Sequence, residues 1–421
     1  TSRVVKPGDA ERNYHIFYQL LEGGKKDDAL QKKLELFDLD DFYYLNQTKI
    51  KQVPGINDEK EYDELVAAMK VLGMSQEEQD EVMKMTAGVL HLGNISYEVD
   101  ASSASEDGCK ISNPAQLTLL SKLLEVDEMQ FGKALTTRAI GVGSVVHVAY
   151  TVNQAINARD ALAKAIYGKL FNWLISRINK SLEKGLSGDD GNSTVQNITG
   201  VLDIFGFESF ETNSFEQLCI NFANEKLQQH FTNYTFKMEN EVYRGEGINF
   251  KGVPFIDNQK VLDFLELRRS GLFNILDEEL KVPNGSSTGF FNKLLKQQEQ
   301  NPLFSVNMKA DKFRFGVTHY AGDVSYDASA FLEKNKDSLF DDLLNALMKS
   351  SVPLIASVLD PASKSTDVQE TNLRATRVSG KKSISIIFRG QLQKLMKTLY
   401  GTSPHYVRCI KPNPAKKARR I

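Results

Sequence analysis

The first half of the chain carries its hydrophobic residues at helical spacing. Residues 13–22 place four apolar side chains on one helical face, and Gly23 and Gly24 predict the end of that helix. The same spacing predicts further helices over residues 61–71, 77–90, 115–124 and 157–182. Between them, residues 99–108 and 185–193 are rich in small and acidic residues and are expected to form exposed loops. This half is therefore expected to be mainly helical.

The pattern changes in the middle of the chain. The apolar run over residues 195–203 predicts a β-strand. Ser214 and Gln217 then have the spacing of a helix capping box, with Asn213 as the competing cap. The helical pattern that follows predicts a helix over residues 214–244, about 45 Å long at 1.5 Å per residue. Its apolar positions change register once instead of holding a heptad, which disfavours a coiled coil.

The last part of the chain begins with a polar segment. Residues 361–382 are rich in serine, threonine, lysine and arginine and show no clear period, so they are expected to form a loop or linker. A helix over residues 385–399 and a strand over residues 405–410 are expected to follow, with Val407 in the core of a sheet.

Composition places the chain among ordinary globular proteins. Its 421 residues are 41% hydrophobic and 25% charged, enough for a large core and two or three subdomains. No apolar stretch approaches the ~20 residues that cross a bilayer, and no signal-peptide pattern is present, so a cytosolic protein without membrane contact through this segment is expected. The net charge of −2 gives no general attraction to nucleic acid.

Cysteines and histidines give no sign of a metal site or a catalytic triad. Cys109, Cys219 and Cys409 are odd in number and far apart, which supports neither a disulfide framework nor a zinc site. The six histidines form no HExxH motif, and no nucleophile elbow marks a serine.

Asp203 and Gly206 form a D-x-x-G pattern where the predicted strand ends and before the long helix. Open α/β sheets bind ligands at the carboxyl ends of their strands. A carboxylate there can help to hold Mg²⁺ or its water, and a glycine amide can approach a γ-phosphate oxygen. Taken alone, four such positions more often form an ordinary turn than a nucleotide switch. The sequence contains no GxxxxGK[ST] loop.

The stretch DIFGFESFETNSFEQLCINFANEKLQQHF, residues 203–231, resembles the second switch and relay helix of myosin motor domains. Five more segments resemble myosin motor segments in the family's own order: SRVVKPGDAERNYHIFYQLL, GVLHLGNI, RDALAKAIYGKLFNWLISRIN, HYAGDVSYDASAFLEKNKDSLF and PHYVRCIKPN. The resemblance implies a predominantly helical α/β fold, a partial P-loop NTPase-type myosin head. The phosphate-binding loop and the first switch are then expected upstream of Thr1.

The resemblance also implies a division of the chain. Residues 1–196 correspond to part of the upper (50 kDa-type) subdomain, and residues 197–360 to the second switch, the relay helix and the lower, actin-binding subdomain. Residues 361–382 correspond to a basic surface loop. Residues 383–421 correspond to the actin-side helix and the return strand to the central sheet.

Three residues receive nucleotide roles from the resemblance. Gly206 would bond the γ-phosphate of ATP through its amide, Asp203 would support Mg²⁺ indirectly, and Glu208 would pair with an arginine of the first switch. A solvated acid near a helix start is the alternative interpretation of Glu208. The function implied is an actin-based motor that couples ATP hydrolysis to movement along actin filaments. This segment alone is expected to be inactive, because the phosphate-binding loop is missing.

The resemblance assigns three groups of residues to the contact with filamentous actin. A helix-loop-helix turn, the basic loop and the C-terminal segment supply these residues, in chain order: Pro283, Asn284, Ser286, Thr288, Arg374, Arg377, Lys381, Lys382, Gln391, Lys394, Lys397, His405, Arg408 and Lys411. A flexible basic loop suits the steering of an acidic partner, although a solvated loop has the same composition.

Ser144 is a candidate for regulatory phosphorylation, because it lies sixteen residues before Asp160, where some myosins carry an acid or a phosphorylatable hydroxyl. A phosphate there would add nearly two negative charges beside the actin contact; a Gly-Ser turn is the alternative. Light chains or calmodulin are expected to bind outside this segment, and the protein is expected in the cytoplasm on the actin cytoskeleton. Two competing interpretations are a myosin relative that only binds actin and an unrelated helical scaffold.

Overall fold

The computed structural model describes residues 2–8, 11–102, 107–140, 146–186, 199–249, 257–282, 285–306, 313–336, 341–359 and 383–407. The chain divides into two compact units. The first unit contains Thr1–Ile198 and Ser338–Thr376, and the second contains Thr199–Asp337 and Arg377–Ile421. Each unit has its own hydrophobic core.

The first unit is helical, with two antiparallel hairpins, β1–β2 and β3–β4. Its described elements are η1 (Ser2–Val4), α1 (His15–Lys26), α2 (Asp28–Leu34), η2 (Leu39–Asp41), α3 (Tyr43–Asn46), α4 (Asp58–Val71), α5 (Gln76–Gly93), β1 (Tyr97–Val99), β2 (Cys109–Ile111), α6 (Pro114–Leu124), α7 (Glu128–Thr136), β3 (Thr137–Ile140), β4 (Val146–Ala149), α8 (Val152–Leu186), α15 (Asp341–Met348) and α16 (Pro353–Leu359). All helices predicted in this half are confirmed.

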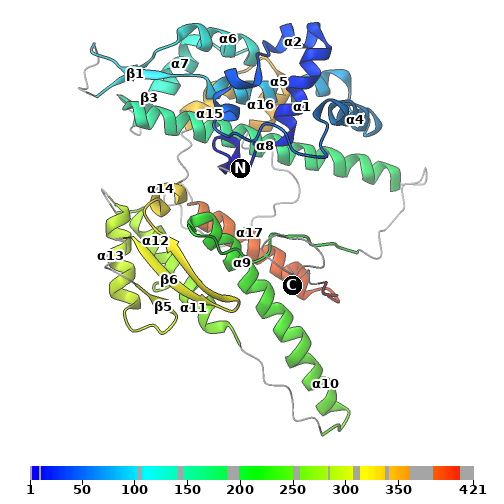
Figure 1. The fold of residues 1–421 in the computed structure, drawn as a ribbon, viewed down its shortest axis with the longest axis vertical. Coiled ribbons are helices and arrows are strands. Elements are labelled where there is room, and N and C mark those ends of the chain that lie inside the picture. Colours follow the sequence, from blue (N-terminus) through cyan, green and yellow to red (C-terminus); the bar gives the residue numbers. More distant parts are fainter. Residues whose placement is uncertain are drawn as a thin grey trace. The chain divides into compact units, whose positions relative to one another are not determined.

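The core of the first unit forms around α5. Every residue over 85–93 is buried, and α5 packs against α1, α6 and α8 (Figure 1). Helices α15 and α16 join the same core, where Leu343, Leu347 and Ile355 are buried. The two compact units therefore divide the chain differently from the expected subdomains, in which residues 197–360 stood together. Residues 341–359 belong with the first unit because their apolar side chains complete its core.

The predicted end of the first long helix was wrong. Helix α1 continues through Gly23 and Gly24 to Lys26. A Cβ atom on Gly23 would lie 2.5 Å from the Tyr62 ring, and one on Gly24 would lie 2.7 Å from Leu36 Cδ1. These glycines allow neighbouring elements to approach the helix closely, which is a tertiary role and not a stop signal.

The second unit combines one small antiparallel sheet with helices. Its described elements are α9 (Phe215–Thr232), η3 (Asn233–Met238), α10 (Glu239–Gly245), α11 (Gln259–Glu266), α12 (Leu272–Glu279), α13 (Ser287–Gln298), β5 (Phe304–Ser305), β6 (Arg314–His319), β7 (Gly322–Asp327), α14 (Phe331–Asn335) and α17 (Ile384–Tyr400). The strands pair in the order β5-β6-β7. Helix α9 packs against α11 and α17 (Figure 1). It also packs against β7, and the core that these elements share is rich in phenylalanine.

The long helix predicted after residue 213 is confirmed. Helix α9, the π-helical turn η3 and α10 follow one another without a break from Phe215 to Gly245. The Gln217 side chain accepts a hydrogen bond from the Ser214 N–H at 2.9 Å, as the capping-box spacing predicted. The π turn was not predicted.

Two predicted strands are absent from the residues that the structure describes. Residues 199–203 form no strand, and Val201 is 94% exposed; the rest of that run lies outside the described residues. Residues 405–407 form no strand either, and Val407 is 91% exposed instead of lying in a sheet core. An apolar run becomes a strand only where another strand pairs with it. Among the described helices, none has the length and apolar character that spanning a membrane requires.

Candidate functional site

The segment from Asp203 to Gly206 is exposed and has no regular secondary structure. A Cβ atom placed on Gly206 would meet no heavy atom within 4 Å. The main chain at Gly206 is thus open to a ligand, with the exposed Asp203 carboxyl group nearby in sequence. A phosphate and its metal ion would require an accessible amide and a nearby carboxylate.

Two asparagines of α9 hold the backbone that follows Asp203. Asn224 Nδ2 donates to the Phe205 carbonyl at 3.0 Å. Asn221 accepts from the Glu208 N–H and donates to the Glu208 carbonyl, both at 2.8 Å. Asparagine is unfavourable in a helix interior, and two of them three residues apart were the available sequence signal for this contact. Neither asparagine is among the residues that the sequence predicted for the site.

A third asparagine joins the same segment to the sheet. Asn213 accepts from the Phe210 N–H at 2.8 Å and donates to the Phe210 carbonyl at 2.9 Å. Asn213 Nδ2 also donates to the Ser325 carbonyl at 2.9 Å, and the Asp327 N–H donates to the Asn213 carbonyl at 2.8 Å. Asn213, considered above only as a helix cap, therefore ties the segment to β7.

A buried polar network continues from Asn221. Its Nδ2 donates to the Tyr326 hydroxyl at 2.8 Å, which lies 2.8 Å from His319 Nε2. His319 Nδ1 lies 3.0 Å from Glu225 Oε1, which also accepts from the Tyr320 N–H at 2.9 Å. Burial raises the pKa of Tyr326 well above its usual value, so its hydroxyl stays neutral. The network connects the backbone of the candidate site to β6 and β7.

The Glu208 carboxylate is half-buried. Gln217 Nε2 lies 3.5 Å from Glu208 Oε2, which is a long contact. Within the described part of the chain, no cation forms an ion pair with Glu208. Its carboxylate can therefore still pair with an incoming cation.

The described actin candidates lie at the surface of the second unit. Ser286 and Thr288 are exposed at the start of α13, where Ser286 Oγ accepts from the Gly289 N–H at 3.0 Å. Helix α17 buries Leu392 and Met396 in the core. The remaining candidates there are Gln391 and Lys397, which are exposed, Lys394, which is half-buried, and His405, which is exposed. Pro283, Asn284, Arg374, Arg377, Lys381, Lys382, Arg408, Lys411 and Ser144 lie outside the described residues.

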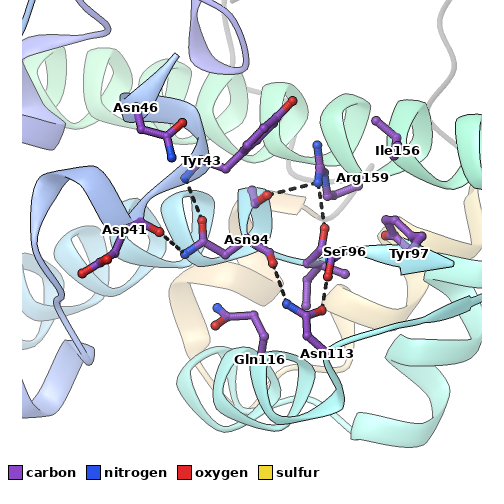
Figure 2. Close-up of a pocket in the computed structure, with 12 residues that line it drawn as sticks. Asp41, Tyr43, Asn46, Asn94, Ser96, Tyr97, Asn113, Gln116, Ile156 and Arg159 are labelled. Carbon is purple, nitrogen blue, oxygen red and sulfur yellow. Dashed lines mark hydrogen bonds between the residues drawn. The ribbon is translucent and has the colours of Figure 1, made fainter. Parts of the chain in front are cut away.

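A pocket of about 510 Å³ in the first unit is a different site, and no residue of the 203–208 segment lines it (Figure 2). Asn94 accepts from the Tyr43 N–H and donates to the Asp41 carbonyl, both at 2.8 Å. Asn113 similarly accepts from the Ser96 N–H at 2.9 Å. These polar groups bond to one another, and several residues around the pocket, among them Tyr43 and Ser96, are exposed.

One group of potential metal ligands occurs among the described residues. His15, Asp58 and Glu61 place ligand atoms within 4.8 Å of one another. The Arg12 guanidinium, however, bonds both Asp58 oxygens at 2.7 Å and lies 2.7 Å from His15 Nδ1. The Arg12 guanidinium already balances the charge of the Asp58 carboxylate, so we interpret the cluster as an ion pair and not as a metal site.

Comparison with known proteins identifies the family. The whole chain, residues 1–421, matches the family model described as Myosin head (motor domain). The chain therefore belongs to the myosin head family, and its helical fold with small sheets agrees with an α/β motor fold.

Individual myosins are similar over nearly the whole chain. Myosin-I heavy chain of Dictyostelium discoideum is 40% identical over 416 residues, which cover 99% of this chain and 17% of that protein. Myosin-15 of Arabidopsis thaliana is 41% identical over 420 residues, which cover 98% of this chain and 26% of that protein. Protein OPAQUE1 of Zea mays is 40% identical over 421 residues, which cover 98% of this chain and 26% of that protein. The chain thus spans about a quarter or less of the length of these relatives.

Proposed function

We propose that this chain is part of an actin-based motor that couples ATP binding and hydrolysis to movement along actin filaments. One observation carries the proposal. The open main chain at Gly206 is followed directly by a backbone that Asn221 and Asn224 tie to α9. A displacement at Gly206 would thus reach a helix that continues, through η3 and α10, to Gly245. Packed elements transmit such changes because they move between discrete arrangements.

We propose for three residues the nucleotide roles that the resemblance implies, and the open main chain at Gly206 supports them. The exposed Gly206 amide would bind the γ-phosphate of ATP, Asp203 would support the Mg²⁺ side, and the uncommitted Glu208 carboxylate would pair with an arginine. These residues fit one part of a phosphate and Mg²⁺ site. The 421 residues contain no GxxxxGK[ST] loop. We therefore propose that ATP hydrolysis requires a complete motor, meaning a myosin head that contains this chain together with such a loop.

The second unit would supply the actin-binding surfaces. The described candidates are Ser286 and Thr288 at the start of α13, the helix α17, and His405. The remaining candidates fall in residues 283–284, 361–382 and 408–411. The first unit would then correspond to the upper subdomain and the second unit to the lower, actin-binding subdomain. Light chains or calmodulin would bind elsewhere, and the complete motor would act on the cytoplasmic actin cytoskeleton.

The substitution Gly206→Ala in the complete motor tests the proposal. The added methyl group meets no protein atom within 4 Å, so folding should be unaffected. It would, however, stand where a phosphate oxygen must approach. We expect actin-activated ATPase to fall at least about tenfold, because one well-placed donor is worth about 10²–10³ in kcat. The measurement is steady-state ATPase with and without actin filaments.

Gly200→Ala is the matched control, since a Cβ atom at Gly200 also meets nothing within 4 Å. This variant should keep both its ATPase and its melting temperature. Wild-type ATPase in Gly206→Ala would contradict the proposal.

Phosphorylation at Ser144 remains a separate proposal that rests on the resemblance of the sequence. A phosphate would place negative charge near the actin contact and change actin activation. We expect Ser144→Glu and Ser144→Ala to differ in actin-activated ATPase. Equal activities in the two variants would rule this regulation out.

A further inference from the structure

The short helix α12 ends with two buried carboxyl groups. Asp277 is 6% exposed and Glu279 is 3% exposed, whereas Glu278 between them is exposed. Helix α12 contacts α13, α14 and α17 (Figure 1). A buried carboxylate is stable only where cations and hydrogen-bond donors surround it. The partners of these two groups therefore show what α12 holds in place.

Glu279 organises the turn that leads into α13. Its Oε1 accepts from the Ser286 N–H at 3.0 Å, and its Oε2 lies 2.6 Å from Lys293 Nζ. Burial opposes ionisation, but Lys293 and the Ser286 N–H outweigh it and lower the pKa of Glu279. Glu279 thus stays ionised and fixes the residue that caps α13.

Two glycines allow this turn to close around Glu279. A Cβ atom on Gly289 would lie 2.2 Å from Glu279 Oε1, and one on Gly285 would lie 2.1 Å from the Glu279 carbonyl oxygen. Side chains at either position would displace Glu279 or the turn. The close approach at Gly289 indicates that the start of α13 packs against this carboxylate, and the one at Gly285 that the chain there packs against the Glu279 main chain.

Asp277 fixes the start of α17 in a similar way. Its Oδ1 accepts from Ser383 Oγ at 2.6 Å and from Asn335 Nδ2 at 3.0 Å, and it also accepts from Ser385 Oγ. Its Oδ2 pairs with Arg389, one turn further along α17. Three donors and one cation from α14 and α17 therefore converge on one carboxylate of α12.

We propose that Asp277 and Glu279 are positioning residues that hold two actin-binding surfaces, the start of α13 and the helix α17, in one fixed arrangement. The inference rests on the proposed actin binding and names the groups that organise it. Two surfaces held in the binding geometry lose little conformational freedom on contact with a filament, which strengthens binding.

The test uses the complete motor, with actin affinity measured by co-sedimentation without nucleotide and with the KM for actin measured from ATPase. Glu279→Ala removes the acceptor for the Ser286 N–H and the partner of Lys293. We expect actin affinity to fall about tenfold, equivalent to about 1.4 kcal/mol. The KM for actin should rise by a similar factor while kcat stays within about twofold. Asp277→Ala should act in the same direction.

Three further variants separate positioning from general stability. Glu278→Ala, on the same helix between the two positions, is the matched control and should behave as the wild type. Glu279→Gln keeps an acceptor for Ser286 and should recover part of the affinity. Lys293→Met changes a side chain that is 41% exposed and should weaken actin binding even if Glu279→Ala fails to fold.

Hydrogen exchange at the Ser286 amide gives a readout that does not depend on actin. It should speed up in Glu279→Ala and not in Glu278→Ala. The inference is overturned if Glu279→Ala and Lys293→Met bind actin as tightly as the wild type. It is also overturned if kcat falls by the same factor as the actin affinity and the melting temperature falls with them. A wild-type motor that does not sediment with actin would instead overturn the proposed function itself.

Discussion

The side-chain amide of Asn221 forms two hydrogen bonds with the backbone of Glu208: it accepts from the Glu208 N–H and donates to the Glu208 carbonyl, at 2.8 Å each. A residue in a β-strand forms the same two backbone hydrogen bonds with a residue of the neighbouring strand. Here a side chain of α9 takes the place of that neighbouring strand. It fixes the backbone two residues after Gly206 while leaving Gly206 itself open.

Loss of the Asn221 amide should destabilise the second unit. Asn221 is fully buried, and Asn221→Ala removes the partners of the Glu208 N–H and carbonyl and one of the two partners of the Tyr326 hydroxyl. At about 1–3 kcal/mol for each such group, we expect the free energy of unfolding to fall by about 2–4 kcal/mol. Urea unfolding of the 421-residue chain measures the loss. Asn224→Ala, which removes bonds from a half-buried side chain, should cost less; an equal or larger cost would contradict this ranking.

A methyl group at Gly23 should be costly although it lies in a helix. Its Cβ atom would lie 2.5 Å from the Tyr62 ring, so Gly23→Ala should lower the free energy of unfolding by about 1–3 kcal/mol through overpacking. Combining it with Tyr62→Ala should cost less than the sum of the two single changes. Strict additivity in this double-mutant cycle would show that the two residues do not clash.

The ion pair of Arg12 and Asp58 should be needed for the stability of the first unit. The two side chains are 3% and 14% exposed, and Arg12 also lies over the Tyr18 ring at 4.4 Å. Arg12→Met should destabilise the chain by about 3–5 kcal/mol, because it leaves a nearly buried carboxylate without its cation. Adding Asp58→Leu should restore part of that loss. If the double variant were less stable than Arg12→Met, the destabilisation caused by Arg12→Met would have to come from lost packing of the Arg12 side chain and not from the unpaired carboxylate.

The pH dependence of stability should report the ionised state of Glu279. Its pKa is lower in the folded protein than the ordinary value of 4.5, so the folded state binds fewer protons than the unfolded chain in acid. The stabilisation is therefore complete above the unfolded pKa and is lost as the pH falls through the folded pKa. Unfolding of the wild type and of Glu279→Gln, measured from pH 7 to pH 3, should show a difference in stability that shrinks in acid. A difference that widens in acid would contradict this sign.

The sequence predicted the long helices well because their apolar spacing is a local property. It failed at Gly23 and Gly24, where the decisive contacts come from Tyr62 and Leu36, far away in the chain. It also failed for residues 199–203, because a strand depends on a partner that no local pattern reveals.

For the candidate site, the sequence indicated Gly206 and its neighbours but not the residues that hold their backbone. Asn221 and Asn224 look like ordinary polar residues until α9 is placed beside the 205–208 backbone. The division of the chain into two units was harder to predict from the sequence. Whether α15 and α16 complete the first core depends on packing against α5, α7 and α8, which no boundary in composition marks.

The placement of α15 and α16 also determines how the chain would respond to proteolysis. The backbone passes between the units three times, near residues 198, 337 and 376. A single protease cut within residues 360–382 would therefore leave two covalent tethers between the units. The released C-terminal fragment would stay bound as well, because Leu392 and Met396 are embedded among side chains of the second core. Such a nicked protein would run as two bands on a denaturing gel and as one species on a sizing column.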